Sequence, residues 1–163
     1  MNISEVIQKM IEYSNGDLHD IDHFLKVYAY ARTIAEGERL PQKEREITEI
    51  AAIVHDIACP LCREKYGNAD GKHQETEGVV LAREFLKGLE LSEDVIERVV
   101  YLVGHHHTYE NVDGSDYRIL LEADYLVNAD ESRYSRENIE NAMKTIFKTQ
   151  TGISLLKSVY RLG

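Results

Sequence analysis

The chain has 163 residues, of which 43% are hydrophobic and 29% charged, the balance of a globular domain that folds without disulfides or a structural metal. Its formal net charge of −10, with no clustered Lys and Arg, argues against a nucleic-acid polymer as partner. No stretch approaches the roughly 18 apolar residues of a membrane span, and the first residues lack the apolar core of a signal peptide. We therefore expect a cytoplasmic protein with no membrane partner.

Helical periodicity runs through the first third of the chain. Ser4 is a suitable N-cap for a first helix that ends near Tyr13, before the Asn15–Gly16 turn signal. A second helix is predicted over about residues 20–38, where apolar residues recur at helical spacing. Pro41 suits the start of a third helix, which ends in an adjacent His-Asp pair.

The remaining segments continue the helical pattern with two interruptions. The predicted order is an irregular segment over 57–73, a helix over about 74–87, a helix that Ser92 caps and that reaches 104, a loop over 107–116, a helix over about 117–128, and one or two helices after Ser135. No strand-like alternation persists. The sequence predicts one all-α domain over 1–163, with about six to eight helices and with C-terminal helices over 131–163. Loops of this length in a compact domain often carry function.

The two cysteines form a close pair in the segment CPLC. The spacing of Cys59 and Cys62 is similar to a redox motif, but that motif needs a βαβ context that this chain lacks. A zinc site would need two more ligands nearby. Ordinary reduced thiols are the plainer interpretation, and a labile disulfide or a metal role stays open.

Histidines and aspartates are unevenly placed along the chain. His19 and His23 are four residues apart on one helix face, His55–Asp56 ends the third helix, and three histidines at 105–107 end the fifth. Asp124 lies in an apolar run, where an inward carboxylate is costly without a partner. Each item alone fits a hydrogen-bonded or solvent-facing residue. Together, imidazoles and carboxylates from several helices could converge on one or two divalent ions in a bundle core.

The order H…HD…D, formed by His23, His55–Asp56 and Asp124, resembles the HD superfamily of metal-dependent phosphohydrolases. HDIDHFLKVYAYARTIA is similar to the first ligand helix of that family, AAIVHDIA to its HD helix, and LLEADYLVN to its final-aspartate helix. The matches span about residues 19–130. The resemblance implies a helical bundle of the HD-domain type, with a divalent metal held by His23, His55, Asp56 and Asp124. It also implies that Asp56 is catalytic, through ligation and, in some accounts, proton handling.

Some members of that family hold a second metal, using histidines between the HD pair and the final aspartate. By position, His73 and the His105–His106 pair are candidates for a second metal ligand or a substrate contact. Gln74 fits the spacing to Gly78 about as well as His73 does. Many members also carry an arginine three residues after the first ligand histidine. Lys26 stands there in this chain, and lysine lacks the planar fork of arginine.

Several charged residues near these motifs have both a functional and an ordinary interpretation. Lys26 and Lys72 are candidate phosphate contacts, as is Lys65, although solvated charges are the plainer interpretation for loop lysines. Glu75 and Glu77 begin a helix, where carboxylates are favoured by the helix dipole in any case. His19 could assist a second metal from one turn away, and it is also an ordinary polar residue of a first turn.

The resemblance implies hydrolysis of a phosphate ester in a nucleotide or another small phosphorylated metabolite. One or two divalent ions (Mn, Fe, Ni, Co, Zn or Mg) would lower the pKa of bound water and neutralise phosphoryl charge. Two alternatives stay open: a di-iron oxygenase, because a few HD-type proteins use this ligand set to activate oxygen, and a nucleotide- or metal-binding sensor without turnover. Apolar stripes of the C-terminal helices could serve a homodimer, and the sequence leaves the oligomeric state open.

Overall fold

The structure is a computed structural model that describes residues 2–163, and within them the secondary structure is entirely helical. The helices are α1 (Ile3–Tyr13), α2 (Leu18–Gly37), α3 (Gln42–Val54), α4 (Cys59–Tyr66), α5 (Gly71–Lys87), α6 (Glu93–Val103), α7 (Ser115–Glu131), α8 (Arg136–Thr145) and α9 (Gln150–Tyr160). The all-α class predicted from the sequence is confirmed.

Short polar side chains cap several of these helices and set their starts. Asp17 accepts a hydrogen bond from the backbone of Asp20, and Ser135 and Thr149 cap α8 and α9 in the same way. The first helix begins earlier than expected, because the side chain of Asn2 accepts from the backbone N–H of Ser4 and is the N-cap. The predicted start at Ser4 is therefore wrong by two positions.

The segment 57–73, predicted as irregular, contains the short helix α4. Pro60 lies in its first turn, where the missing N–H costs nothing, and Gly67 ends it in the left-handed conformation at φ 76°. Eight residues are too few for an apolar period to show in the sequence. The thiols of Cys59 and Cys62 are free and buried on this helix.

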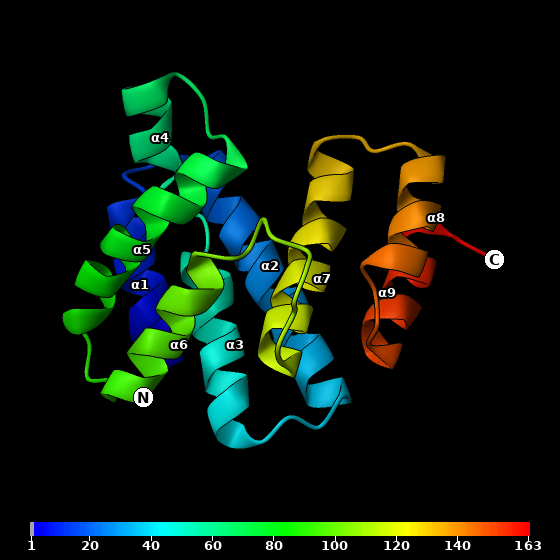
Figure 1. Ribbon diagram of the computed structural model, residues 1–163, viewed down its shortest axis with the longest axis horizontal. Helices are drawn as coiled ribbons and strands as arrows, with labels where there is room; N and C mark the ends of the chain where they lie inside the picture. Colours follow the sequence, from blue (N-terminus) through cyan, green and yellow to red (C-terminus); the bar gives the residue numbers. More distant parts are fainter. Residues whose placement is uncertain (1) are drawn as a thin grey trace.

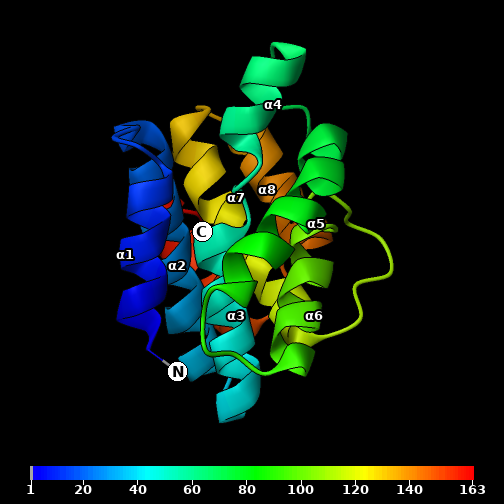
Figure 2. The same ribbon diagram turned by 90° about the vertical axis from the view of Figure 1, so that its left-hand side faces the viewer.

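Three helices form the centre of the molecule and carry the HD-type motifs. α2 packs against α3 and α7, and α3 also packs against α7 and α6 (Figure 1). Within this centre, α7 lies on the side of the C-terminal helices α8 and α9, and most of its side chains are buried. In the second view, α1 covers one side and the pair α5–α6 the other (Figure 2). The centre therefore brings three segments, distant in sequence, into contact.

A buried carboxylate ties the C-terminal helices to α7. Glu122 is fully buried, and its Oε2 accepts from the backbone N–H groups of Lys148 and Thr149 at 2.9 and 3.1 Å. Its Oε1 accepts from the Thr149 hydroxyl at 2.6 Å, at the start of α9. Gly152 makes room for it, because a Cβ there would lie 1.9 Å from Oε1 of Glu122. Burial raises the pKa of this carboxyl, while the three donors counteract the effect.

Within residues 2–163, no helix is both long and apolar enough to cross a membrane.

Candidate metal centre

The side chains of the H…HD…D residues meet in the buried centre. His23 faces inward from the second turn of α2, His55 and Asp56 follow the last turn of α3, and Asp124 lies in the middle of α7. Nε2 of His23 lies 3.1 Å from Oδ1 of Asp124 and 3.0 Å from Oδ2 of Asp56. Nε2 of His55 lies 3.2 and 3.4 Å from the same two oxygens. Two imidazoles and two carboxylates thus share one small volume.

The hydrogen bonds of the outer ring nitrogens fix the orientation of both imidazoles. Nδ1 of His55 donates to the carbonyl of Ala52 at 2.7 Å, since a carbonyl can only accept. Nδ1 of His23 lies 2.7 Å from Oε1 of Glu131 and donates to that carboxylate. In the neutral rings, Nε2 therefore carries the lone pair, and the two Nε2 atoms face each other at 3.2 Å. This is the tautomer that a metal-ligating histidine requires.

These inward atoms require positive charge among them. Burial opposes the charged form of His23, yet its contacts with Asp124 and Asp56 prevail and raise its pKa to about 11. For His55, burial again opposes the charge, and the same two carboxylates raise the pKa to about 10. Burial alone would raise the pKa of Asp124, but the attraction of His55 and His23 holds it below its ordinary value. Either protons or a cation must balance the two carboxylates.

The spacing fits a divalent cation. Ligand atoms that share one ion at about 2.1 Å lie roughly 3.0 to 3.4 Å apart in octahedral or tetrahedral arrangements. The four contacts between the imidazole nitrogens and the carboxylate oxygens run from 3.0 to 3.4 Å. Among the described residues, His23, His55 and Asp56 form a group with ligand atoms within 4.8 Å of one another. The residues present therefore fit the metal that the sequence resemblance implies.

A second group shares Asp56 and lies toward α5 and α6. Asp56, His106 and His107 have ligand atoms within 4.8 Å of one another. Oδ1 of Asp56, the oxygen that turns away from His23 and His55, lies 3.4 Å from Nε2 of His106. Nδ1 of His106 donates to the carbonyl of Val103 at 2.6 Å, so its neutral ring also presents a lone pair. Asp56 could thus bridge two ions.

The side chain of Gln74 completes this second group. Its Oε1 lies 3.1 Å from Nε2 of His106 and 2.8 Å from Nε2 of His107. Its amide nitrogen donates to the carbonyl of Ala69 at 2.5 Å, which aims the oxygen at the two rings. A neutral carboxamide oxygen, two imidazoles and one shared carboxylate make a less anionic donor set than the first group has.

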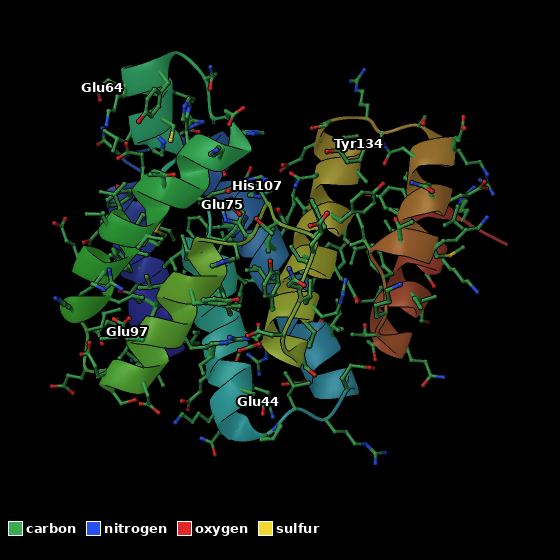
Figure 3. The ribbon with its side chains drawn as sticks, viewed as in Figure 1. Glu44, Glu64, Glu75, Glu97, His107 and Tyr134 are labelled. Carbon is green, nitrogen blue, oxygen red and sulfur yellow. The ribbon has the colours of Figure 1, made fainter. Side chains whose placement is uncertain are left out.

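His107 is held in place from two sides. Its backbone N–H donates to Oε2 of Glu75 at 3.1 Å, and the neighbouring Thr108 hydroxyl donates to the same oxygen at 2.9 Å. Figure 3 labels Glu75 and His107 in this region of the molecule. Gly71 lets the ring approach, because a Cβ there would lie 2.8 Å from Cγ of His107. Burial and the neighbouring His106 lower the pKa of His107 to about 4.

Two of the predicted histidines lie outside both groups. His105 turns back along α6, where its Nδ1 donates to the carbonyl of Tyr101 at 2.7 Å and its ring stacks on Tyr101 at 4.0 Å. His73 stacks on Tyr66 at 3.8 Å, and its Nδ1 is buried without a hydrogen-bond partner. At position 74 the side chain faces the centre, so Gln74 rather than His73 reaches the second group. A substrate contact of His73 or His105 stays a prediction.

Two of the lysines predicted as phosphate contacts face carboxylates of the protein. Lys26 is half-exposed and lies 3.8 Å from Oε2 of Glu131, and Lys65 pairs with Glu77 at 2.7 Å. Lys72 is exposed in the first turn of α5. His19 is exposed on α2, as a polar residue of a first turn would be. The phosphate contacts expected of Lys26 and Lys72 stay predictions.

Two contributors were missed from the sequence. His107 was the third of three adjacent histidines, and nothing in the sequence says which of them faces inward. Glu131 follows Asp124 by seven residues, two helical turns, which places both on one face of α7. That spacing was a usable signal.

Comparison with known proteins gives one family and one solved structure. The model of the HD domain family matches residues 20–140, which include all four residues of the H…HD…D motif. The chain is similar to the crystal structure of a predicted HD superfamily hydrolase from an uncultured Thermotogales bacterium. The TM-score is 0.67 at 22% sequence identity, over 98% of this chain and 83% of that chain. No curated protein gives a significant match. At this identity the solved structure supports the fold.

Proposed function

The chain belongs to the HD domain family, and on that premise we propose that it is a metal-dependent phosphohydrolase acting on a nucleotide or another small phosphorylated metabolite. One observation carries the proposal. Nε2 of His23 and Nε2 of His55 lie 3.0 to 3.4 Å from the inward oxygens of Asp56 and Asp124, in a tautomer that leaves both lone pairs free.

His23, His55, Asp56 and Asp124 would hold one divalent ion, and Asp56, His106, His107 and Gln74 a second. A bound ion would supply the lowered pKa of a coordinated water and the neutralisation of phosphoryl charge. Oxygen and imidazole donors suit manganese, iron, nickel, cobalt, zinc or magnesium. The second group holds a single carboxylate, so we expect its ion to bind more weakly than the first.

Asp56 is more exposed than His55 and Asp124, so substrate would approach the centre beside it. Its side chain is 27% exposed, whereas that of His55 is fully buried and that of Asp124 is 6% exposed. The attraction of His55, together with hydrogen bonds from His106 and His23, outweighs burial and holds the pKa of Asp56 well below its ordinary value. The carboxylate is therefore ionised at neutral pH, as a metal ligand must be.

The charge distribution favours a small substrate over a long polyanion. The chain carries a formal charge of −10, and Lys26 and Lys65 near the centre already have carboxylate partners. A polymer would need neighbouring phosphates neutralised by free cations along a groove. A small phosphorylated metabolite needs only the charge at the centre itself, with Lys26 and Lys72 as candidate contacts to the rest of the molecule.

The test is phosphate release from nucleotides and sugar phosphates by metal-stripped protein to which each divalent ion is restored in turn. We expect metal-dependent release that Asp56→Ala abolishes. Glu44→Ala is the matched control, because Glu44 is an exposed acid at the opposite end of α3 (Figure 3) and its loss should leave the rate unchanged. Metal bound at the four residues without release from any substrate would overturn the hydrolase proposal.

A further inference from the structure

The inward imidazoles differ in what holds their outer nitrogen. Nδ1 of His55 donates to the carbonyl of Ala52, and Nδ1 of His106 donates to that of Val103, each three residues earlier in the chain. Both histidines stand just past the end of a helix, where backbone carbonyls are free to accept. His23 lies inside α2, where the carbonyls are occupied by the helix itself. Its acceptor must come from another element.

That acceptor is Glu131, the last residue of α7, 108 residues further along the chain. Oε1 of Glu131 lies 2.7 Å from Nδ1 of His23, and the two side chains are only 13% and 6% exposed. Asp124, seven residues earlier on the same helix, contacts the opposite ring nitrogen of His23 at 3.1 Å. The imidazole is therefore contacted at both nitrogens by two carboxylates that lie two turns apart on one face of α7.

The position of Glu131 is unfavourable for a carboxylate without such a partner. The carbonyl end of a helix carries partial negative charge, so an acid in the last turn is repelled by the helix dipole. This one is also largely screened from water. Its Oε2 lies 3.8 Å from Nζ of Lys26, which stands one turn after His23 on α2. One oxygen of Glu131 therefore faces Lys26, and the other accepts the hydrogen bond from Nδ1 of His23.

We propose that Glu131 is a positioning residue for metal binding, which holds His23 in the Nδ1–H tautomer and makes its Nε2 a stronger ligand than a carbonyl-held histidine would offer. A carboxylate acceptor forms a charge-assisted hydrogen bond and increases the basicity of the far nitrogen. The inference rests on the proposed role of His23 as a metal ligand. It concerns Glu131 itself, which belongs to neither donor group.

The first measurement is the affinity of the metal-stripped full chain for Zn²⁺ and Mn²⁺, by competition with a chelator. Loss of such an outer carboxylate costs about 10- to 100-fold in metal affinity. We expect Glu131→Ala to lie near the upper end, and Glu131→Gln near the lower end, because an amide oxygen still accepts from Nδ1. Asp130→Asn is the matched control: it removes an exposed acid from the adjacent position and should change affinity less than about twofold.

The second measurement is a spectroscopic signature of the hydrogen bond. In the zinc-loaded wild type, the Nδ1 proton of His23 should resonate far downfield and exchange slowly, and Glu131→Ala should abolish that signal. Thermal unfolding of the metal-free variants shows whether they fold. Unchanged affinity and an unchanged proton signal in folded Glu131→Ala would overturn the inference. An equal loss of affinity in Asp130→Asn would also overturn it, because the effect would then be general electrostatics. A wild type that binds no metal would instead defeat the proposed function.

Discussion

The Nε2 atoms of His23 and His55 face each other at 3.2 Å in the buried centre, although neither can donate a hydrogen to the other when both rings are neutral. Oxygens of Asp56 and Asp124 lie within 3.4 Å of both. The arrangement is stable only with positive charge among the four groups, and the predictions below follow from how that charge is supplied.

Divalent ions should stabilise the folded chain strongly. An ion at about 100 times its dissociation constant adds about 2.7 kcal/mol to the free energy of unfolding. For a chain of this size that corresponds to a rise of about 5 to 10 °C in Tm. Asp124→Asn should fold without metal and lose most of the rise, because a neutral amide replaces one of the two carboxylates. Calorimetry with and without chelator measures this, and no shift with any divalent ion would contradict it.

The stability of the metal-free protein should fall as pH rises above neutrality. Contacts with Asp124 and Asp56 raise the pKa of His23 from 6.5 to about 11, and the same carboxylates raise that of His55 to about 10, in both cases against burial. The folded state therefore binds more protons than the unfolded chain in this range. Its extra stability is fully present below pH 6.5 and is lost as pH rises through the raised values.

Metal binding should show the opposite trend, because an ion competes with those protons. The rise in Tm on adding metal should therefore grow between pH 6.5 and 8.5, and protons should be released on binding. Unfolding midpoints across this range, with calorimetry in buffers of different ionisation enthalpy, measure both effects. Burial and His106 lower the pKa of His107 to about 4. Its contribution to the free energy of unfolding therefore falls as pH falls below 6.5, and it does not change the trend above that pH. A metal effect that does not change with pH would contradict the prediction.

Gly71→Ala should affect the second ion and spare the first. Position 71 is the first residue of α5, and the Cβ of an alanine there would lie 2.8 Å from Cγ of His107 and displace that ring. Direct titration should show two bound ions in the wild type and one in the variant, with Tm changed by no more than a few degrees. His107→Ala should reproduce the stoichiometry. Two ions retained in both variants would show that His107 is not a ligand.

Gly152→Ala should destabilise the chain by about 2 to 4 kcal/mol. The new Cβ would lie 1.9 Å from Oε1 of Glu122 and would separate that buried carboxylate from its donors at Lys148 and Thr149. Denaturant unfolding measures the change. In a Glu122→Ala background the same substitution should cost less, because the main clash is gone. Equal costs in the two backgrounds would show that Glu122 and Gly152 are not coupled.

The fold could be predicted from the sequence because apolar residues recur at local helical spacing along each helix. The first donor group could be predicted because the H…HD…D order resembles the motif of a known family. The orientation of consecutive residues at a helix end could not be predicted. His105, His106 and His107 stand where the regular turn is ending, so their directions depend on which acceptor each ring finds. For the same reason, the sequence could not show whether His73 or Gln74 faces the second donor group.

Short helices and remote partners also escaped prediction. α4 has eight residues and is defined by Pro60 at one end and Gly67 at the other, without a full apolar period. The sequence did not single out Glu122 or Glu131, because their partners lie at least 26 residues away along the chain. Only the seven-residue spacing from Asp124 to Glu131 could have singled one of them out.

The packing of α7 on several sides at once fixes its length as well as its composition. Glu122 serves the start of α9, while Asp124 and Glu131 serve opposite nitrogens of His23. One residue inserted between positions 124 and 131 would turn everything beyond it by about 100° and advance it by about 1.5 Å. That would remove Glu131 from His23 while leaving Asp124 in place. Homologous chains should therefore vary in the loops on either side of this helix and keep the count of residues within it constant.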